Sequence, residues 1–374
     1  MRAFADAHAR TWSLLGDLTP EQWRVPYLPG INPPLWEYGH VAWFTERWLL
    51  RGAGSDSAAL APPLLADVDR WFDSMRVAHP ERWHLDLPPL DELRDYVAAV
   101  LAGVISRLAD AGGSDDALYF FRLALFHEDM HGEALTWMRQ TLDYPVPAPL
   151  ALPSLAPSGG EVEIGGRFVM GAAAGSGFAF DNEKWAHEVE LPEARIDRQW
   201  VSNRAYADFV ASGGYRDERW WSGDGLAWLK AAGQTQPQRW RLAPDGAWEQ
   251  RWFGRWVPLP LDLPVCHVNA YEAEAYCHWA GRRLPSEVEW EFAASRGLIR
   301  WGGAVWEWMA DPFQPYAGFS PDPYRDYSAP WFHSHRSARG GSFATVARMH
   351  HPCYRNFFLP QRNDVFVGFR TCAV

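Results

Sequence analysis

The sequence predicts two domains, an N-terminal all-α four-helix bundle and a C-terminal α+β domain rich in loops. Apolar residues recur at helical spacing as far as residue 142. A proline-rich segment then follows Tyr144, and beyond it the apolar segments are short and strand-like, with Gly, Pro and Trp throughout. We therefore expect the first domain over residues 1–147 and the second over residues 158–374.

The first domain is expected to contain four main helices. Thr19 is also predicted to cap a helical restart before Gln22. Pro33 and Pro34 favour the start of the second main helix, and Gly112-Gly113 ends the third. The expected ranges are 3–16, 34–51, 87–110 and 117–142, with a short helical piece at 64–76. Amphipathic helices with one long middle connection describe a bundle whose inward-facing side chains can build a metal site.

The second domain reads differently, because its segments are short. Strands are expected at 161–164 and 167–171, and helices at 269–280 and 286–294. Between the two domains, Pro145, Pro147, Pro149, Pro153 and Pro157 make a linker that cannot continue a helix. This pattern is typical of a compact α+β domain with long loops.

Composition limits the function. Of the 374 residues, 48% are hydrophobic and 22% charged, and the net charge is −11 with no basic run, which argues against a nucleic-acid partner. No apolar segment approaches the roughly 20 residues of a membrane span. The four cysteines have no CxxC spacing, and the N-terminus lacks the apolar core of a signal peptide. We expect a cytoplasmic protein that acts on small molecules, with no membrane partner.

Histidines supply the first candidate site. His127 and His131 stand four residues apart on a predicted helix, which places their side chains on one face. His40 lies in an apolar, aromatic helix, where an unpaired polar ring would be costly. Three neutral imidazoles without a carboxylate suit Zn, Fe, Cu or Ni. The alternative is that His127 and His131 only form hydrogen bonds in a core or face solvent.

The second half resembles the formylglycine-generating-enzyme or sulfatase-modifying-factor domain, a variant of the C-type lectin fold. Eight motifs carry the resemblance. They are 168–171, 181–189, 201–203, 264–269, 281–291, 305–308, 339–343 and 368–370.

The first half resembles the DinB-like bundle that precedes this domain in the EgtB, OvoA and SenA synthases. Residues 32–40 and the His127-x-x-x-His131 pair match the three-histidine iron motif of that family. The resemblance implies that His40, His127 and His131 bind Fe(II). It also implies an O2-dependent reaction that joins sulfur or selenium to the imidazole of hercynine, the Nα-trimethylated histidine.

The resemblance also implies substrate-binding residues. Tyr354-Arg355-Asn356-Phe357 matches the C-terminal signature of the family, in which the Asn helps hold the imidazole substrate. Arg76 and His79 fall where γ-glutamylcysteine-using relatives place two arginines for the carboxylates of that donor. Phe358 stands in place of an acidic residue that binds the donor's ammonium group.

These departures favour a neutral donor. With His79 and Phe358 at those positions, a carboxylated donor loses charge-assisted partners. We therefore expect a selenosugar donor, as in the selenoneine synthases (SenA), the branch to which residues 118–131 and 362–372 look most similar. The alternative is an EgtB- or OvoA-type sulfoxide synthase that joins hercynine or histidine with cysteine or γ-glutamylcysteine.

Other departures bear on the remaining functions. Formylglycine-generating enzymes use two cysteines five apart, but here Cys353 is followed by Phe358 at the second position, which argues against an oxidase acting on a peptide cysteine. Ala304 replaces the Asn of the family's calcium-binding element, so calcium binding is in question. A non-enzymatic lectin-like binding module with a structural bundle is the last alternative.

Several residues are candidates from their chemistry alone. A phenol near the iron could deliver a proton, and Tyr316 and Tyr324 are the candidates. A trimethylammonium group needs aromatic faces, which Tyr316, Phe319, Tyr324, Tyr327 and Trp331 could supply, unless they fill a core. Glu133 is expected to accept a hydrogen bond from a ligand histidine, unless it is an exposed helix carboxylate.

Overall fold

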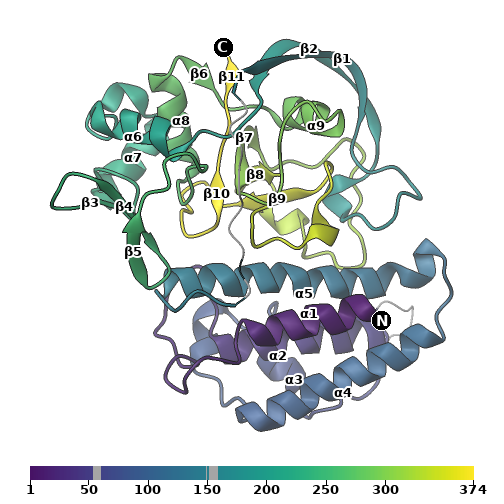
Figure 1. The fold of residues 1–374 in the computed structure, drawn as a ribbon. Coiled ribbons are helices and arrows are strands. Elements are labelled where there is room, and N and C mark those ends of the chain that lie inside the picture. Colours follow the sequence, from purple (N-terminus) through teal and green to yellow (C-terminus); the bar gives the residue numbers. More distant parts are fainter. Residues whose placement is uncertain (54–59, 149, 151–158) are drawn as a thin grey trace. The chain divides into compact units, whose positions relative to one another are not determined.

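The computed structural model describes residues 1–53, 60–148, 150 and 159–374. These residues divide into two compact units. The first unit contains Met1–Leu142 and is helical, and the second contains Asp143–Pro145 and most of the chain from Leu150 to Val374, with its sheets and helices (Figure 1). The expected fold class, an all-α bundle followed by an α+β domain, is confirmed.

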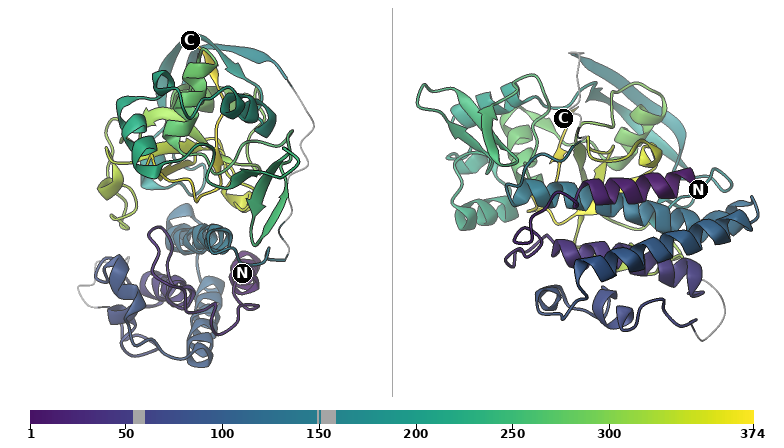
Figure 2. Two further views of the ribbon diagram at one scale, coloured as in Figure 1. Left: turned by 90° about the vertical axis from the view of Figure 1, so that its left-hand side faces the viewer. Right: turned by 60° about the horizontal axis from the view of Figure 1, so that its bottom comes forward.

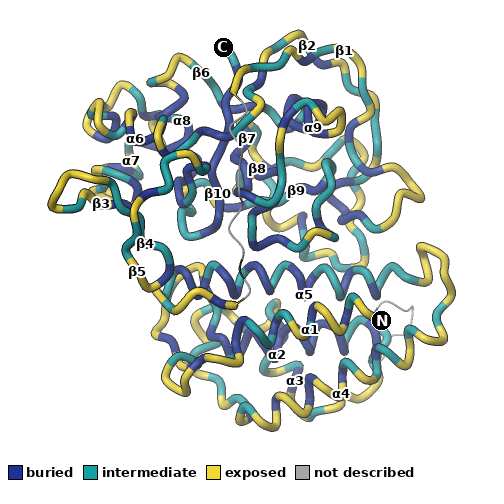
Figure 3. Tube along the Cα trace, viewed as in Figure 1, coloured by how far each residue is buried: buried dark blue, intermediate teal, exposed yellow. Residues whose placement is uncertain are grey.

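The first unit is a bundle of four long helices with one short helix in the connection (Figure 2). Its helices are α1 (Arg2–Ser13), α2 (Pro34–Thr45), α3 (Val68–Phe72), α4 (Leu90–Ala109) and α5 (Asp115–Thr141). Helix α2 packs on α3, α4 and α5, so it lies inside the unit. Its residues are buried on every side, as an apolar helix without a polar face requires (Figure 3).

Local details of the bundle differ from the expectation. The turn at Thr19 makes reciprocal bonds with Gln22 but starts no helix. The short piece is helical only at Val68–Phe72. The second helix continues to Leu50 as a π-helical turn, Glu46–Leu50, in which the Arg51 N–H donates to the Glu46 carbonyl. Residues 54–59 lie outside the described residues.

Short strands and helices build the second unit. Its strands are β1 (Glu161–Met170), β2 (His187–Asp197), β3 (Trp240–Leu242), β4 (Trp248–Trp252), β5 (Arg255–Pro258), β6 (Arg282–Arg283), β7 (Trp306–Pro312), β8 (Arg336–Arg339), β9 (Arg355–Phe358), β10 (Val367–Gly368) and β11 (Cys372–Ala373). Its helices are α6 (Asn203–Ala211), α7 (Gly223–Ala232), α8 (Ala270–Trp279) and α9 (Glu287–Ser295).

Among the described residues, the strands pair into three sheets. Their strand orders are β1-β2-β11-β6, β10-β7-β8-β9 and β3-β4-β5. The two strands expected at 161–171 form the single strand β1, which has a bulge between Ile164 and Gly166. The parallel pair β10-β7 and the antiparallel pairs β7-β8 and β8-β9 place residues 355–357 of the C-terminal signature on the edge strand β9 of the second sheet, next to β8.

Helix α9 covers β1 and β2 and also packs on β7 and β8, so it joins the first two sheets. Its Trp290 is buried in a core with Ile164, Leu191 and Ile196. Asp143, just before the linker, also belongs to this unit, because its carboxylate accepts hydrogen bonds from Arg239 and Arg251 at 3.4 and 3.2 Å. Within the proline-rich linker, residues 149 and 151–158 fall outside the described part of the chain. No helix in the described part is long and apolar enough to cross a membrane.

Candidate metal centre

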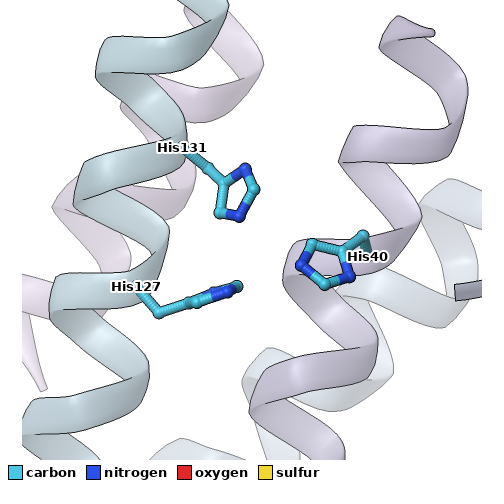
Figure 4. Close-up of side chains that lie close together, drawn as sticks. All are labelled: His40, His127 and His131. Carbon is cyan, nitrogen blue, oxygen red and sulfur yellow. The ribbon is translucent and has the colours of Figure 1, made fainter. Parts of the chain in front are cut away.

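Helices α2 and α5 bring the three predicted histidines together. His127 and His131 project from successive turns of α5, and His40 faces them from α2 (Figure 4). The ring centroids lie 5.2 Å apart for His40–His127, 5.0 Å for His40–His131 and 4.5 Å for His127–His131. One nitrogen from each ring lies within 4.8 Å of the other two. Three nitrogens at these separations can surround a single metal ion.

Neighbouring acceptors fix the tautomer of two rings. The Nδ1 of His40 lies 2.8 Å from the Phe72 carbonyl oxygen, which can only accept, so Nδ1 carries the proton. The Nδ1 of His131 lies 2.7 Å from Oε1 of Glu37. Because Nδ1 donates in both rings, a neutral imidazole presents the lone pair on Nε2 to a metal.

Burial keeps these imidazoles neutral. His40 and His127 are each 3% exposed, and burial lowers the pKa of both well below its usual range, with the nearby His131 ring adding to the effect. The neutral form is the one that binds metal, so the pocket holds the rings ready for a cation at neutral pH.

Aromatic side chains enclose the histidines. Trp36 stacks on His40 with centroids 4.7 Å apart, and Phe44 stacks on His127 at 3.6 Å. Beyond Trp36, the Arg82 guanidinium lies over the indole at 4.0 Å, and its Nη1 donates to Oδ1 of Asn32 at 2.6 Å. Arg82 was not among the predicted site residues, and its positive charge acts on both His40 and Glu37.

Glu133 was expected to accept a hydrogen bond from a ligand histidine, and for His131 this expectation was wrong. Glu133 is buried, at 5% exposure, and is therefore not a solvent-facing carboxylate, but the bond to His131 comes from Glu37. Residues two apart on a helix point in different directions, so a partner for His131 is better placed on another helix. The available signal was the spacing of Glu37 and His40, three apart on one helix.

Arg76 and His79, the residues of the first unit at the expected binding positions for the sulfur or selenium donor, make other contacts. Arg76 is 72% exposed and pairs with Asp73 at 3.4 Å. The Nε2 of His79 lies 2.6 Å from the Ile31 carbonyl oxygen, and its ring packs on Tyr27 and Trp83. The exposed Arg76 lines a surface hollow of about 660 Å³ with Asp67, Arg70 and Glu81.

In the second unit, strand β9 presents the signature residues. Asn356 is partly buried, and its Oδ1 accepts from the Phe357 N–H at 2.8 Å. Arg355 is 1% exposed, and its guanidinium donates to Glu287 and to the carbonyls of Asn182 and Gln314. This arginine is therefore part of the framework that holds β9. Phe358 is buried against Trp308.

The candidate tyrosines differ in their contacts. Tyr316 has a buried hydroxyl without a hydrogen-bond partner among the described residues, and burial raises the pKa of this phenol. Its ring lies 4.3 Å from the Arg355 guanidinium and 4.9 Å from the His187 ring. Tyr324 is partly buried, with its ring 6.1 Å from that of Tyr327.

The remaining proposed cage residues also lie in aromatic contacts. Tyr327 stacks on Phe180 at 4.1 Å, Phe319 packs on Phe332, and Trp331 packs on His335. Phe180 is buried, so Tyr327 is also part of a core contact.

The positions that bear on the other functions are defined as well. Cys353 is a free thiol, and burial raises its pKa to about 12, which keeps it in the unreactive protonated form at neutral pH. Next to Ala304 in the calcium-element segment, the Glu307 carboxylate already accepts from Arg370 and Trp200. Its charge is thus balanced without a cation.

Comparison with known proteins agrees with this layout. Residues 3–135 match the DinB superfamily, and residues 158–301 and 296–373 match the sulfatase-modifying factor enzyme 1-like domain. The chain is 34% identical to the hercynine oxygenase of Mycolicibacterium smegmatis over 92% of this chain and 91% of the relative. It is also 34% identical to the hercynine oxygenase of Mycobacterium tuberculosis over 98% and 96%.

A more distant relative matches only part of the chain. The formylglycine-generating enzyme of Streptomyces coelicolor is 29% identical over 61% of this chain and 92% of its own length. The extended match to the two mycobacterial proteins therefore decides the family. The chain, which joins a DinB-superfamily bundle to a sulfatase-modifying factor enzyme 1-like domain, belongs to the EgtB-like family of hercynine oxygenases.

Proposed function

We propose that this protein is a non-haem Fe(II)- and O2-dependent oxidoreductase that joins selenium from a selenosugar to the imidazole of hercynine. The observation that carries the proposal is the set of three imidazoles, His40, His127 and His131, with one nitrogen of each within 4.8 Å of the others. Nitrogen ligands without a carboxylate fit Fe(II), and the hercynine oxygenase relatives support the choice of iron and of hercynine.

The bound iron supplies the O2-dependent redox chemistry that forms the new bond. The residues around the site orient the ligand rings and shield them from water. The Phe72 carbonyl and Glu37 hold the rings of His40 and His131 in one tautomer, so two ligand nitrogens are set before a metal arrives. Trp36 and Phe44 exclude water from the buried imidazoles.

Residues of the second unit are proposed to bind hercynine. Asn356 has a side-chain NH2 that can donate to the imidazole while its oxygen stays bonded to the backbone. Tyr316 and Tyr324 remain the candidates for a proton donor. The raised pKa of Tyr316 means that its phenol keeps its proton at neutral pH, as a general acid requires.

The selenosugar donor is supported by the positions that would bind a charged donor. Arg76 is exposed and paired with Asp73, His79 is bonded to a backbone carbonyl, and Phe358 is a buried apolar ring. A sugar needs hydrogen bonds rather than a clamp of charges. A selenol is also more acidic than a thiol, so more of it is anionic at neutral pH.

One observation favours the alternative, an ergothioneine- or ovothiol-type sulfoxide synthase. Arg82 brings a guanidinium close to Trp36 and His40, and a guanidinium is a good partner for the carboxylate of cysteine or γ-glutamylcysteine. An experiment must therefore decide between a selenosugar donor and a cysteine or γ-glutamylcysteine donor.

The test is reconstitution of the purified protein with Fe(II) under anaerobic conditions, followed by O2 and hercynine. A selenosugar and γ-glutamylcysteine are supplied at equal concentration, and products are identified by mass spectrometry. A dominant C–Se product is expected. A dominant sulfoxide would assign the protein to the sulfur branch, and the His127→Ala variant, which should lose iron and turnover, is the control for metal-dependent chemistry.

The same samples address the two other functions. A lectin-like binding module should hold no iron in the bundle, so iron analysis of the wild-type protein is decisive. An oxidase acting on peptide cysteines should convert a cysteine peptide without hercynine, but the partly buried, protonated Cys353 and the apolar Phe358 offer no pair of reactive thiols for it.

A further inference from the structure

We propose that Glu37 is a positioning residue of the metal centre, which sets the affinity of the site for Fe(II) and the ease with which the iron is oxidised. The proposal rests on the proposed function, because it needs a metal ion on His40, His127 and His131. It concerns a residue that binds no metal itself and acts through His131.

The contact is short and sheltered. Oε1 of Glu37 lies 2.7 Å from Nδ1 of His131, and Glu37 is 1% exposed. The His131 side chain is 18% exposed, whereas His40 and His127 are buried, so packing alone restrains His131 less. A buried carboxylate at this distance makes a strong, charge-assisted bond that holds the ring in one orientation.

Helix geometry explains why the partner comes from α2. Glu37 and His40 stand three residues apart, so they share one face of that helix, and the face is turned to α5. One helix therefore supplies a ligand, His40, and the group that orients a ligand on the neighbouring helix. The relative placement of α2 and α5 is fixed by the same contacts that shape the metal site.

The two oriented ligands differ electronically. His40 donates to a neutral carbonyl, that of Phe72, whereas His131 donates to a carboxylate. A carboxylate partner makes an imidazole a better electron donor to a metal. It also places a negative charge one ring away from the ion, and this charge stabilises Fe(III) more than Fe(II) because the Coulomb energy grows with the charge of the ion.

The discriminating variant is Glu37→Gln, which keeps the size and one acceptor oxygen but removes the charge. We expect Fe(II) binding to weaken by about 10- to 100-fold, the usual effect of losing a partner of a ligand histidine. The midpoint potential of the bound iron should rise, because the negative charge that favours Fe(III) is gone. Affinity is measured by competition with a chelator, and the potential by redox titration.

The matched control is Glu128→Gln. Glu128 is also buried in the bundle, at 7% exposure, but it accepts a hydrogen bond from Thr11 at 3.0 Å. Its variant should lose stability without a change in the potential of the iron. A residue with only a structural role would behave like Glu128, so the potential separates positioning from packing.

Each outcome has a clear meaning. An unchanged affinity and potential in Glu37→Gln would overturn the proposal while leaving the proposed function intact. A wild-type protein that binds no iron would instead overturn the proposed function. Circular dichroism of the metal-free variants checks folding. If Glu37→Gln does not fold, Glu37→Asp, which shortens the reach of the carboxylate, should show the weaker affinity, and normal affinity there would contradict the proposal.

Discussion

Asn356 uses only one side of its amide in the fold. Its oxygen accepts from the Phe357 N–H, and the residue is held in register by the pairing of β9 with Ala338 on β8. The NH2 group is therefore the part that can donate to a ligand. The surrounding strand is rigid because the neighbouring Arg355 is bonded to Glu287.

Replacement of Asn356 by Ala should weaken hercynine binding and leave Fe(II) in place. Loss of a donor that leaves a bound polar group unpaired costs about 1–3 kcal/mol, or roughly 5- to 150-fold in affinity. Calorimetric titration of hercynine into the iron-loaded protein measures the effect. The exposed Gln361→Ala serves as the control, and an unchanged affinity in Asn356→Ala would remove this residue from the substrate site.

At this scale the sequence predicted the histidines better than their partners. His127 and His131 share a helix face by spacing, and His40 is conspicuous as a polar ring in an apolar helix. Partners depend on which helices pack together. Glu37 and His131 are 94 positions apart in sequence and meet only because α2 packs against α5. Phe72 binds His40 through its backbone carbonyl, and every residue has such a carbonyl, so the residue type does not indicate this contact.

Gly39 of helix α2, one residue before the ligand His40, has no room for a side chain. A Cβ on Gly39 would lie 2.3–2.4 Å from two ring carbons of Phe72, a side chain with 0% exposure. Phe72 also provides the carbonyl that holds His40. The close approach of α3 to α2 therefore requires glycine at this position.

The variant Gly39→Ala should destabilise the bundle by about 1–3 kcal/mol, the usual cost of overpacking a core, and should also weaken Fe(II) binding through the displaced Phe72 carbonyl. Chemical denaturation and the chelator competition assay measure the two effects. Gly103→Ala on α4 is the matched control, because its Cβ meets only the end of the Leu50 side chain. Equal stability of the two variants would contradict this account.

Helix α8 gives a pH-dependent prediction. Its cap is a reciprocal pair in which the Asn269 N–H donates to Glu272 at 2.8 Å and the Glu272 N–H donates to Asn269 at 2.9 Å. Tyr215 donates to the other oxygen of Glu272. Burial raises the pKa of this carboxyl to about 7.

A folded-state pKa above the unfolded value means that the folded protein binds the proton more tightly. The contribution of Glu272 to stability is therefore fully present below the unfolded pKa and is lost as pH rises through about 7. Between pH 5 and pH 8 the unfolding free energy of the wild type should fall, and this fall should exceed that of Glu272→Gln by up to about 3 kcal/mol. The free energy is measured by chemical denaturation at both pH values. A parallel change in both proteins would show that Glu272 does not titrate in this range.

In the second unit, the two helices with a full capping box were predicted, whereas α6 and α7, which have only a serine cap, were not. Helices α8 and α9 are capped by Asn269 and Ser286, each with Glu three residues later, and both were expected within a residue or two. The sheet β3-β4-β5 was not expected. Its strands have three to five residues, and β4 is half-buried on both faces, so it shows no alternation of apolar and polar residues.

The second unit as a whole is held by buried ion pairs that join distant segments. Arg370 and Glu307 are both 0% exposed and are bonded through Nε and Nη2, with Trp200 as a further donor. Arg370 also donates to the carbonyls of Asp197 and Arg198 at 2.9 and 3.1 Å. It thereby ties the end of β2 and strand β7 to the C-terminal segment.

Removing one member of such a pair leaves an uncompensated buried charge. Arg370→Met should lower the unfolding free energy of the second unit by about 3–5 kcal/mol, because Glu307 would lose its partner in a site closed to water. The contrasting ion pair is Arg167 and Glu190. Their charged atoms lie 2.8 Å apart, but the two side chains are 80% and 70% exposed. Water solvates both charges there, so Arg167→Met should leave stability almost unchanged. Denaturation followed by tryptophan fluorescence compares the variants, and equal losses would mean that burial does not set the strength of these ion pairs.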